Sequence, residues 1–221
     1  MQPEQPPQPR SLLSSYLWLG FVALLLGTTY AIVLWRMQPV PGETSVLAAA
    51  ADSSATFATV QPFALVDSRG QKVTNETLLG RPAIVAFVFT RCTGPCPGVT
   101  SSMKKLHDLT KNDAIRLVTI TVDPEYDTPE VLAEYARNIG ADVERWLFLT
   151  GPPDDVRAVC EKSFLSPMAR DASRPVGESI THRTYLSVVD KKGLVRGYYA
   201  SENDAGIEAA LKRARFLASA P

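Results

Sequence analysis

Hydrophobic and polar positions divide the chain into one long apolar run and a longer region of short alternating segments. Residues 17–35 carry no charge, and Tyr16, Trp18 and Trp35 lie at the two ends of this run. About 20 apolar residues span a bilayer, and aromatic side chains concentrate at its interfaces. The run is also longer than the apolar core of a cleaved signal peptide. We therefore predict a single transmembrane anchor over residues 16–36.

The segments on either side of the predicted anchor are polar. Residues 1–15 begin with a Pro/Gln-rich stretch that is typical of a disordered tail, and residues 37–60 have the small and polar composition of a linker. Arg10 and Arg36 flank the anchor one on each side, so charge leaves its orientation undecided. We expect the folded domain at residues 61–221.

Within the domain, β-branched and apolar runs alternate with segments of helical spacing. We predict strands at 63–66, 84–89, 115–122, 146–150, 185–189 and 195–199. We predict helices at 97–111, 153–164 and 204–217. A further helix begins after Thr128, with Thr128 as its N-cap and Pro129 as its first residue. The continuous apolar run 84–89 indicates a central strand that is buried on both faces. This order predicts an α/β domain with a thioredoxin-like fold and an additional N-terminal β-hairpin.

Charge and cysteine content limit the classes of function. The chain has 23 basic and 23 acidic residues and no Lys/Arg block, so nothing suggests a nucleic-acid partner. Three cysteines are too few for a disulfide scaffold. Two of them, Cys92 and Cys96, are close together, which indicates a metal or redox site.

Cys92 and Cys96 lie between the buried strand 84–89 and the helix that follows it. Pro97 suits the first helical position, so we expect Cys96 at the N-cap and Cys92 in the preceding loop. The backbone amides and dipole at a helix N-terminus stabilise thiolates, and Arg91 adds positive charge nearby. We therefore expect both thiols to ionise near neutral pH.

Two thiolates form a soft site that favours Cu(I), zinc or an iron–sulfur cluster. A structural zinc site needs four ligands, and the histidines of the chain are His107 and His182. His107 follows Cys96 by eleven residues on the same predicted helix, about 16 Å along its axis, and cannot join the cysteines. His182 precedes the strand 185–189, which could lie beside the cysteine loop. Two cysteines and one histidine fit low-coordinate Cu(I) better than structural zinc.

Three further residues are open to a structural and a functional interpretation. Cys160 shares a helix face with Val156 and Val159, which favours a buried structural thiol. Asp123 and Asp127 follow the strand 115–122, and carboxylates at such a strand end often lie near a functional site. A solvated turn explains the two aspartates equally well.

The chain resembles the Sco/SenC family of copper proteins, which serve cytochrome c oxidase assembly. The resemblance extends from Phe63 to the last predicted helix. It is carried by segments 89–92, 96–97, 121–125, 127–130 and 146–151, and by His182 before the terminal hairpin. Two positions depart from the family pattern, because Thr93 replaces the usual Pro after the first cysteine and Ser187 replaces a frequent Tyr.

The resemblance implies that Cys92, Cys96 and His182 bind one copper, with Asp123 and Asp127 near it. It implies a metallochaperone that delivers copper to the copper-centre subunit of cytochrome c oxidase or to another copper acceptor, and a thiol reductant that keeps the cysteines reduced. It also implies that the domain faces the bacterial periplasm or the mitochondrial intermembrane space. We expect the bacterial inner membrane, with the domain facing the periplasm.

Other functions remain open on the sequence. A thiol–disulfide oxidoreductase would cycle Cys92 and Cys96 as a redox pair, although three intervening residues differ from ordinary thioredoxins. A peroxiredoxin-type peroxidase is disfavoured, because its Pro-x-x-x-Thr-x-x-Cys signature is matched at neither cysteine; Phe89 occupies the Thr position for Cys92 and the Pro position for Cys96. The sequence does not separate a copper sensor or store from a chaperone.

Overall fold

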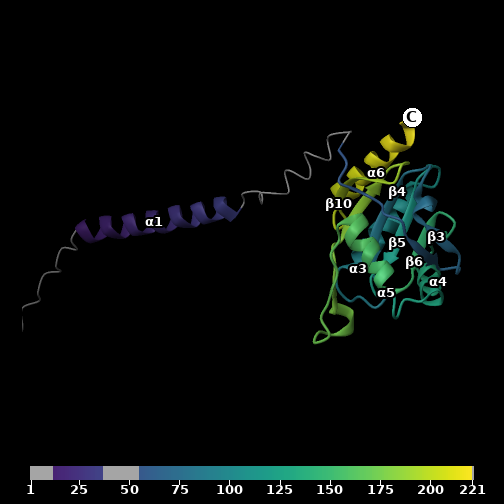
Figure 1. The fold of residues 1–221 in the computed structure, drawn as a ribbon. Coiled ribbons are helices and arrows are strands. Elements are labelled where there is room, and N and C mark those ends of the chain that lie inside the picture. Colours follow the sequence, from purple (N-terminus) through teal and green to yellow (C-terminus); the bar gives the residue numbers. More distant parts are fainter. Residues whose placement is uncertain (1–11, 37–54, 221) are drawn as a thin grey trace, which may run out of the picture. The chain divides into compact units, whose positions relative to one another are not determined.

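The computed structural model describes residues 12–36 and 55–220. The chain divides into two units, residues 1–45 and residues 46–221. The first contains helix α1 (Leu12–Arg36), which begins before the expected start of the anchor at residue 16 (Figure 1). In the described residues, no helix is both long and apolar enough to cross a membrane. The predicted anchor is therefore not confirmed, and most of the predicted tail and linker lies outside the described residues.

In the described part of the second unit, eight strands form one mixed sheet of order β1-β10-β9-β4-β5-β6-β2-β3 (Figure 1). The strands are β1 (Ala58–Thr59), β2 (Ala64–Asp67), β3 (Lys72–Thr74), β4 (Ala83–Val88), β5 (Arg116–Thr121), β6 (Trp146–Thr150), β9 (Tyr185–Val189) and β10 (Leu194–Ala200). Strands β4, β5 and β6 are parallel, and β9 pairs antiparallel with β4. The predicted N-terminal hairpin is β2–β3, and the α/β class is confirmed.

The four predicted helical segments form α3 (Cys96–Leu109), α4 (Pro129–Asn138), α5 (Pro153–Ala158) with its π-helical continuation η2 (Val159–Ser163), and α6 (Asp204–Ser219). The short helices η1 (Asn75–Leu78) and η3 (Val176–Glu178) were not predicted. Thr128 is the N-cap of α4 as predicted, since its side chain accepts a hydrogen bond from the Val131 amide. Helices α3 and α6 contact each other and β4, whereas α4 contacts β6.

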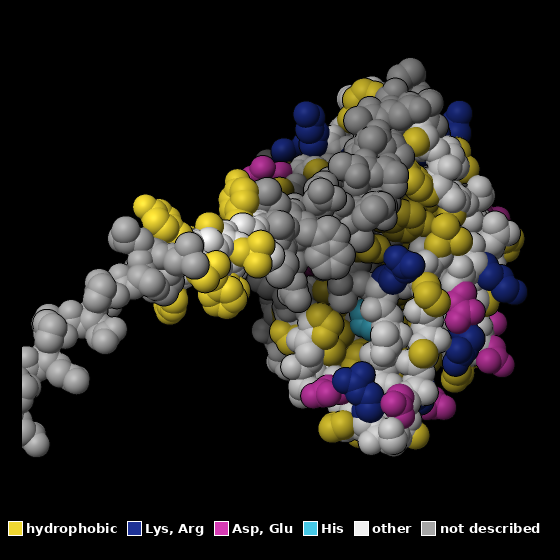
Figure 2. All heavy atoms as spheres, turned by 90° about the vertical axis from the view of Figure 1, so that its left-hand side faces the viewer, with side chains coloured by type: hydrophobic (Ala, Val, Ile, Leu, Met, Phe, Trp, Pro, Cys, Tyr) yellow, Lys and Arg dark blue, Asp and Glu magenta, His cyan; other side chains and the backbone are white. Residues whose placement is uncertain are grey.

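Strand β4 is the centre of the core. All six of its residues are buried, as expected for a strand covered on both faces. Aromatic rings extend the core on either side: Trp146 stacks near Phe148 with ring centroids 4.8 Å apart, and Phe87 meets Phe164 edge-on at 5.4 Å. The outer surface is mixed in charge, and Figure 2 shows Lys/Arg and Asp/Glu side chains interspersed on the visible face.

Strand β1, which lies within the predicted linker 37–60, and a small hairpin were also not predicted from the sequence. Strands β7 (Ala169–Arg170) and β8 (Ile180–Thr181) form a separate two-stranded antiparallel hairpin. We call residues 169–181 the β7–β8 arm; it projects from the sheet in Figure 1. It leads directly into His182 and therefore affects the position of that side chain.

Cys160 lies in η2 and is fully buried, as the sequence indicates. Burial raises the pKa of its thiol well above the ordinary value. Because the thiolate is the reactive form, Cys160 should resist iodoacetamide in the native reduced protein while Cys92, which is partly exposed, is alkylated. Mass spectrometry of digests made with and without guanidinium would test this. Equal labelling of Cys160 and Cys92 in the native state would contradict it.

Candidate metal centre

The cysteine loop joins β4 to α3, as expected. The amide of Cys92 donates to the Phe89 carbonyl at 3.2 Å, and Cys92 is partly buried against the core. Cys96 is 1% exposed and is the first residue of α3. From the sequence we expected Cys96 at the N-cap, which directly precedes the first helical residue. That position belongs to Pro95, whose backbone angles of φ −76° and ψ −20° are already helical.

The expectation that both thiols ionise near neutral pH is wrong for Cys96. Burial is the main cause that raises the pKa of Cys96 far above its ordinary value, and a hydrogen bond with the neighbouring Cys92 thiol acts in the same direction. Desolvation therefore outweighs the favourable helix terminus. In the metal-free protein, Cys96 keeps its proton, and a metal ion would have to displace it.

His182 approaches Cys96 from the end of the β7–β8 arm. Its Nε2 lies 3.7 Å from Cys96 Sγ, and its Nδ1 lies 3.0 Å from the Arg183 carbonyl oxygen. A carbonyl only accepts, so Nδ1 carries the proton and the Nε2 lone pair faces the cysteine. Burial lowers the pKa of His182, which favours the neutral imidazole that metal ions require.

The other histidine lies outside this site. His107 Nε2 accepts a hydrogen bond from the Asp142 amide at 3.3 Å, and its ring packs 5.7 Å from that of Trp146. This agrees with its exclusion on helix geometry.

Cavities reach the cysteine loop from two directions. One of about 270 Å³ is lined by Cys92, His182 and residues of the β7–β8 arm. The other, of about 400 Å³, is lined by Cys92, Cys96 and side chains of α3 and α4 that include Thr100 and Tyr135. In the part of the chain that the structure describes, no cluster of three or more His, Cys, Asp or Glu side chains has the geometry to hold a metal ion. The predicted set of three ligands therefore stays a prediction.

Asp127 fixes the start of the cysteine loop. It is fully buried, and its carboxylate accepts hydrogen bonds from the Thr90 amide at 3.1 Å and from the hydroxyls of Thr90 and Thr121, both at 2.5 Å. Burial raises the pKa of this carboxyl above its ordinary range. Asp127 thus connects the end of β5 to Thr90, two residues before Cys92.

Replacing Asp127 by Ala should destabilise the fold by about 2–4 kcal/mol, because the buried Thr121 hydroxyl and two partly buried donors of Thr90 lose their acceptor. Asp127→Asn should lose less, since its carbonyl still accepts and its amide can donate to the Thr90 hydroxyl. Urea unfolding would measure both, with the exposed Glu208→Ala on α6 as a control that changes stability by less than about 0.5 kcal/mol. An Asp127→Ala loss no larger than this control would show that the network is weak.

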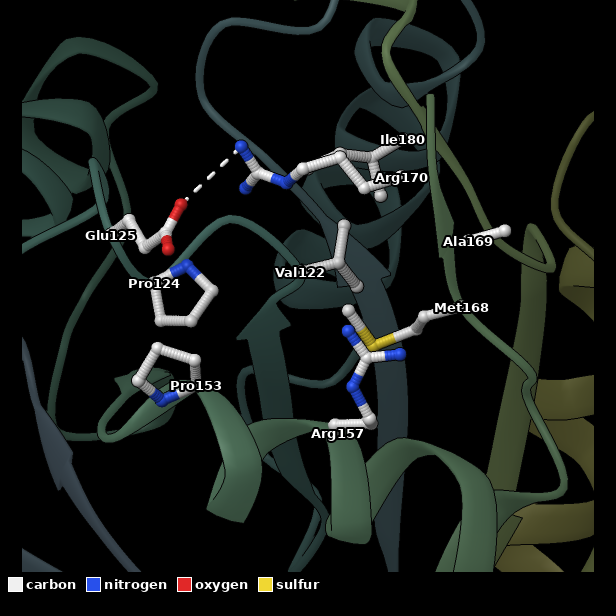
Figure 3. A pocket seen from close by; sticks show the side chains of 9 residues that line it. All are labelled: Val122, Pro124, Glu125, Pro153, Arg157, Met168, Ala169, Arg170 and Ile180. Carbon is white, nitrogen blue, oxygen red and sulfur yellow. Dashed lines mark ion pairs between the residues drawn. The ribbon is translucent and has the colours of Figure 1, made fainter. Parts of the chain in front are cut away.

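Asp123 is also buried, at 1% exposure, and is not the solvated turn that the sequence left open. Its Oδ2 lies 2.6 Å from Arg91 Nη2 and its Oδ1 lies 2.5 Å from Arg170 Nη2. Arg170 also forms an ion pair with Glu125 at 3.4 Å, across the small pocket in Figure 3. Sequence reasoning singled out Asp123 but not Arg170, which lies in a polar segment without regular periodicity.

Comparison with known sequences assigns the chain to a family. The model of the SCO1/SenC family matches residues 51–216. The SCO1 protein homolog of Bacillus subtilis is 32% identical over 149 residues, which are 65% of this chain and 75% of that protein. The mitochondrial protein SCO2 of Saccharomyces cerevisiae is 31% identical over 187 residues, which are 80% of this chain and 59% of that protein.

Solved structures share the fold. BsSco, described as a member of the Sco family of cytochrome c oxidase assembly proteins with a disulfide switch, superposes with a TM-score of 0.65 at 26% identity, covering 74% of this chain and 95% of its own. Yeast Sco1 with copper bound gives a TM-score of 0.60 at 24% identity and covers 75% and 92%. These structures confirm the predicted thioredoxin-like fold.

Proposed function

Because the chain belongs to the SCO1/SenC family, we propose that it is a copper chaperone in which Cys92, Cys96 and His182 bind one copper ion for cytochrome c oxidase assembly. The observation that carries this proposal is the 3.7 Å approach of His182 Nε2 to Cys96 Sγ, with the Cys92 thiol beside them. Two sulfurs and one imidazole nitrogen are the donors that soft Cu(I) prefers. Yeast Sco1, which shares this fold, was solved with copper bound.

Each residue has a separate part in binding and release. Cys96 is buried and would hold copper at the base of the loop once its proton is displaced. Cys92 is more accessible and lines both cavities, so an incoming thiolate of a copper acceptor can reach the ligand that it replaces. His182 contributes a neutral donor that is already oriented by the Arg183 carbonyl.

A Cu(I) titration of the reduced full chain against a competing chelator tests the proposal. We expect one tightly bound copper per chain. Because Cys96 holds its proton in the metal-free protein, its release should raise the apparent affinity about tenfold per pH unit over the neutral range. Cys160→Ala should bind as wild type does. Failure of the wild type to compete with the chelator would contradict the proposal.

We also propose where the chain is located in the cell. The uncharged run 17–35 supports a membrane anchor. We propose that this anchor lies in the bacterial inner membrane, with the copper-binding domain in the periplasm. Protease treatment of spheroplasts should then degrade the domain, while a cytoplasmic marker survives. A protected domain would contradict this orientation, and recovery of the full-length chain in the soluble fraction would contradict the anchor.

A thiol–disulfide oxidoreductase is the second candidate. The free, neighbouring thiols of Cys92 and Cys96 favour it, as does the disulfide switch described for BsSco. The accessible Cys92 would attack a partner disulfide and Cys96 would displace the partner thiol, leaving a Cys92–Cys96 disulfide and two partner thiols. A thiol reductant would then restore the pair. Disulfide exchange with no competitive copper binding would favour this alternative.

A further inference from the structure

The buried carboxylate of Asp123 connects two segments that lie far apart in the sequence. Its oxygens lie 2.6 Å from Arg91 and 2.5 Å from Arg170, and Asp123 is 1% exposed. An ion pair with one buried partner is screened less than a surface pair. This bridge therefore holds Arg91 and Arg170 at fixed positions relative to each other.

The two arginines lie next to the residues proposed to bind copper. Arg91 immediately precedes Cys92, and its guanidinium lies 4.0 Å from the centroid of the Tyr126 ring. Arg170 pairs with Ile180 across the β7–β8 hairpin, and Ile180 is two residues before His182. The bridge thus runs from the cysteine loop to β7, whose partner strand β8 ends directly before the histidine.

Figure 3 shows Arg170 at a small pocket beside this bridge. Its side chain extends over the pocket toward Glu125, on the side of the pocket where Pro124 lies. Arg157 is the other guanidinium of the same pocket, but it comes from α5 and pairs with Glu161 at 3.8 Å. Arg157 therefore offers a matched comparison that does not touch the bridge.

A hydrogen bond also joins the β7–β8 arm to the cysteine loop. The Thr93 amide donates to the Gly177 carbonyl at 3.1 Å. A Cβ atom at position 177 would lie only 2.5 Å from Thr93 Oγ1 and 2.9 Å from the Arg91 carbonyl oxygen. The arm consequently contacts the loop on both sides of Cys92.

We propose that Arg170 is a positioning residue of the metal centre: through Asp123 it holds the β7–β8 arm on the cysteine loop, and so keeps His182 directed at Cys96. The hydrogen bonds of His182 itself are those to the adjacent Arg183 carbonyl and to Cys96. The first of these is local, and the His182 ring also meets the Phe89 ring edge-on, with centroids 6.4 Å apart. The β7–β8 arm fixes the backbone directly before the histidine and so contributes to its placement. The consequence for copper rests on the proposed function.

Four variants of the full chain test this role: Arg170→Ala, Arg170→Lys, Arg157→Ala and the double variant Arg170→Ala/His182→Ala. Loss of a residue that supports a ligand weakens metal binding by about 10–100-fold, and we expect about tenfold for Arg170→Ala in the Cu(I) competition titration. Arg170→Lys should recover most of this loss, because a single cation still meets Asp123. Arg157→Ala should bind as wild type does. In a chain that already carries His182→Ala, the Arg170→Ala substitution should cause no further loss of Cu(I) affinity.

Amide hydrogen exchange of Thr93 in the metal-free protein gives a readout that does not involve copper. Arg170→Ala should speed this exchange, and Arg157→Ala should not. Unchanged exchange and copper affinity in Arg170→Ala would overturn the positioning role, as would an equal loss of affinity with and without His182. A wild-type chain that binds no copper would overturn the proposed function instead, while faster Thr93 exchange would still show that Arg170 holds the arm.

Discussion

Cys96→Ser should abolish tight Cu(I) binding, with an apparent affinity reduced by more than the roughly 100-fold upper range for residues that only support a ligand. Serine has nearly the same shape, so the loop and the start of α3 should be retained. Its hydroxyl is a harder donor than a thiolate and does not ionise near neutral pH, so the soft pair of sulfurs is lost. Cys96 is also the sulfur that faces His182 at 3.7 Å.

The measurement is the chelator competition at one fixed pH, with urea unfolding to confirm that the variant is folded. Cys92→Ser should show a comparable loss, since the proposal gives both sulfurs to the copper. Cys160→Ala serves as the control, because this thiol is fully buried in η2 and outside both cavities. Copper affinity of Cys96→Ser within a few-fold of wild type would contradict the assigned ligand.

His182→Ala should weaken Cu(I) binding by at least about 100-fold, the upper range for residues that only support a ligand, while leaving disulfide exchange by Cys92 and Cys96 intact. The imidazole supplies the third donor, and burial keeps it neutral. A copper site needs this donor, whereas thiol–disulfide exchange needs only the two sulfurs. The two proposed activities therefore separate in this variant.

His107→Ala is the matched control for that experiment. It should lower the free energy of unfolding, because the ring packs on Trp146 and accepts from the Asp142 amide, but it should not change copper affinity. A His182→Ala protein that binds copper as wild type does, or one that loses disulfide exchange as well, would argue against the three-donor site.

Local sequence signals predicted most of the domain. The apolar run at 84–89 appears as the fully buried β4, and the Thr128–Pro129 pair starts α4 as expected. Both depend on short-range preferences, either for burial of an uninterrupted apolar strand or for capping of a helix. The start of α3 differed by one residue, because Pro95 adopts helical backbone angles that Pro97 alone did not indicate.

The β7–β8 arm could not be predicted in the same way. Its strands have two residues each, which is too short for a recognisable alternation, and both residues of β7 are exposed. The contacts that hold the arm, from Arg170 to Asp123 and from Gly177 to Thr93, join residues that are distant in sequence. Such contacts leave no periodic signal.

The sequence singled out Cys92, Cys96 and His182, and the structure places Cys96 and His182 3.7 Å apart with Cys92 beside them. Copper binding by these three residues stays a prediction, and the electrostatics of the site could not be predicted from the sequence. The ionisation of Cys96 was wrong, because it depends on how deeply the packed loop is buried. Asp123 and Asp127 are buried as well. This burial was not predicted, because it depends on partners that only the folded chain brings together.

X-ray absorption at the copper edge is the most direct test of the central claim. The sample would be the reduced full chain loaded with one equivalent of Cu(I). We expect a copper ion bound by two sulfurs and one nitrogen, with the nitrogen lost in His182→Ala and one sulfur lost in Cys92→Ala. A spectrum that the His182 substitution leaves unchanged, or one without sulfur neighbours, would contradict copper binding by Cys92, Cys96 and His182.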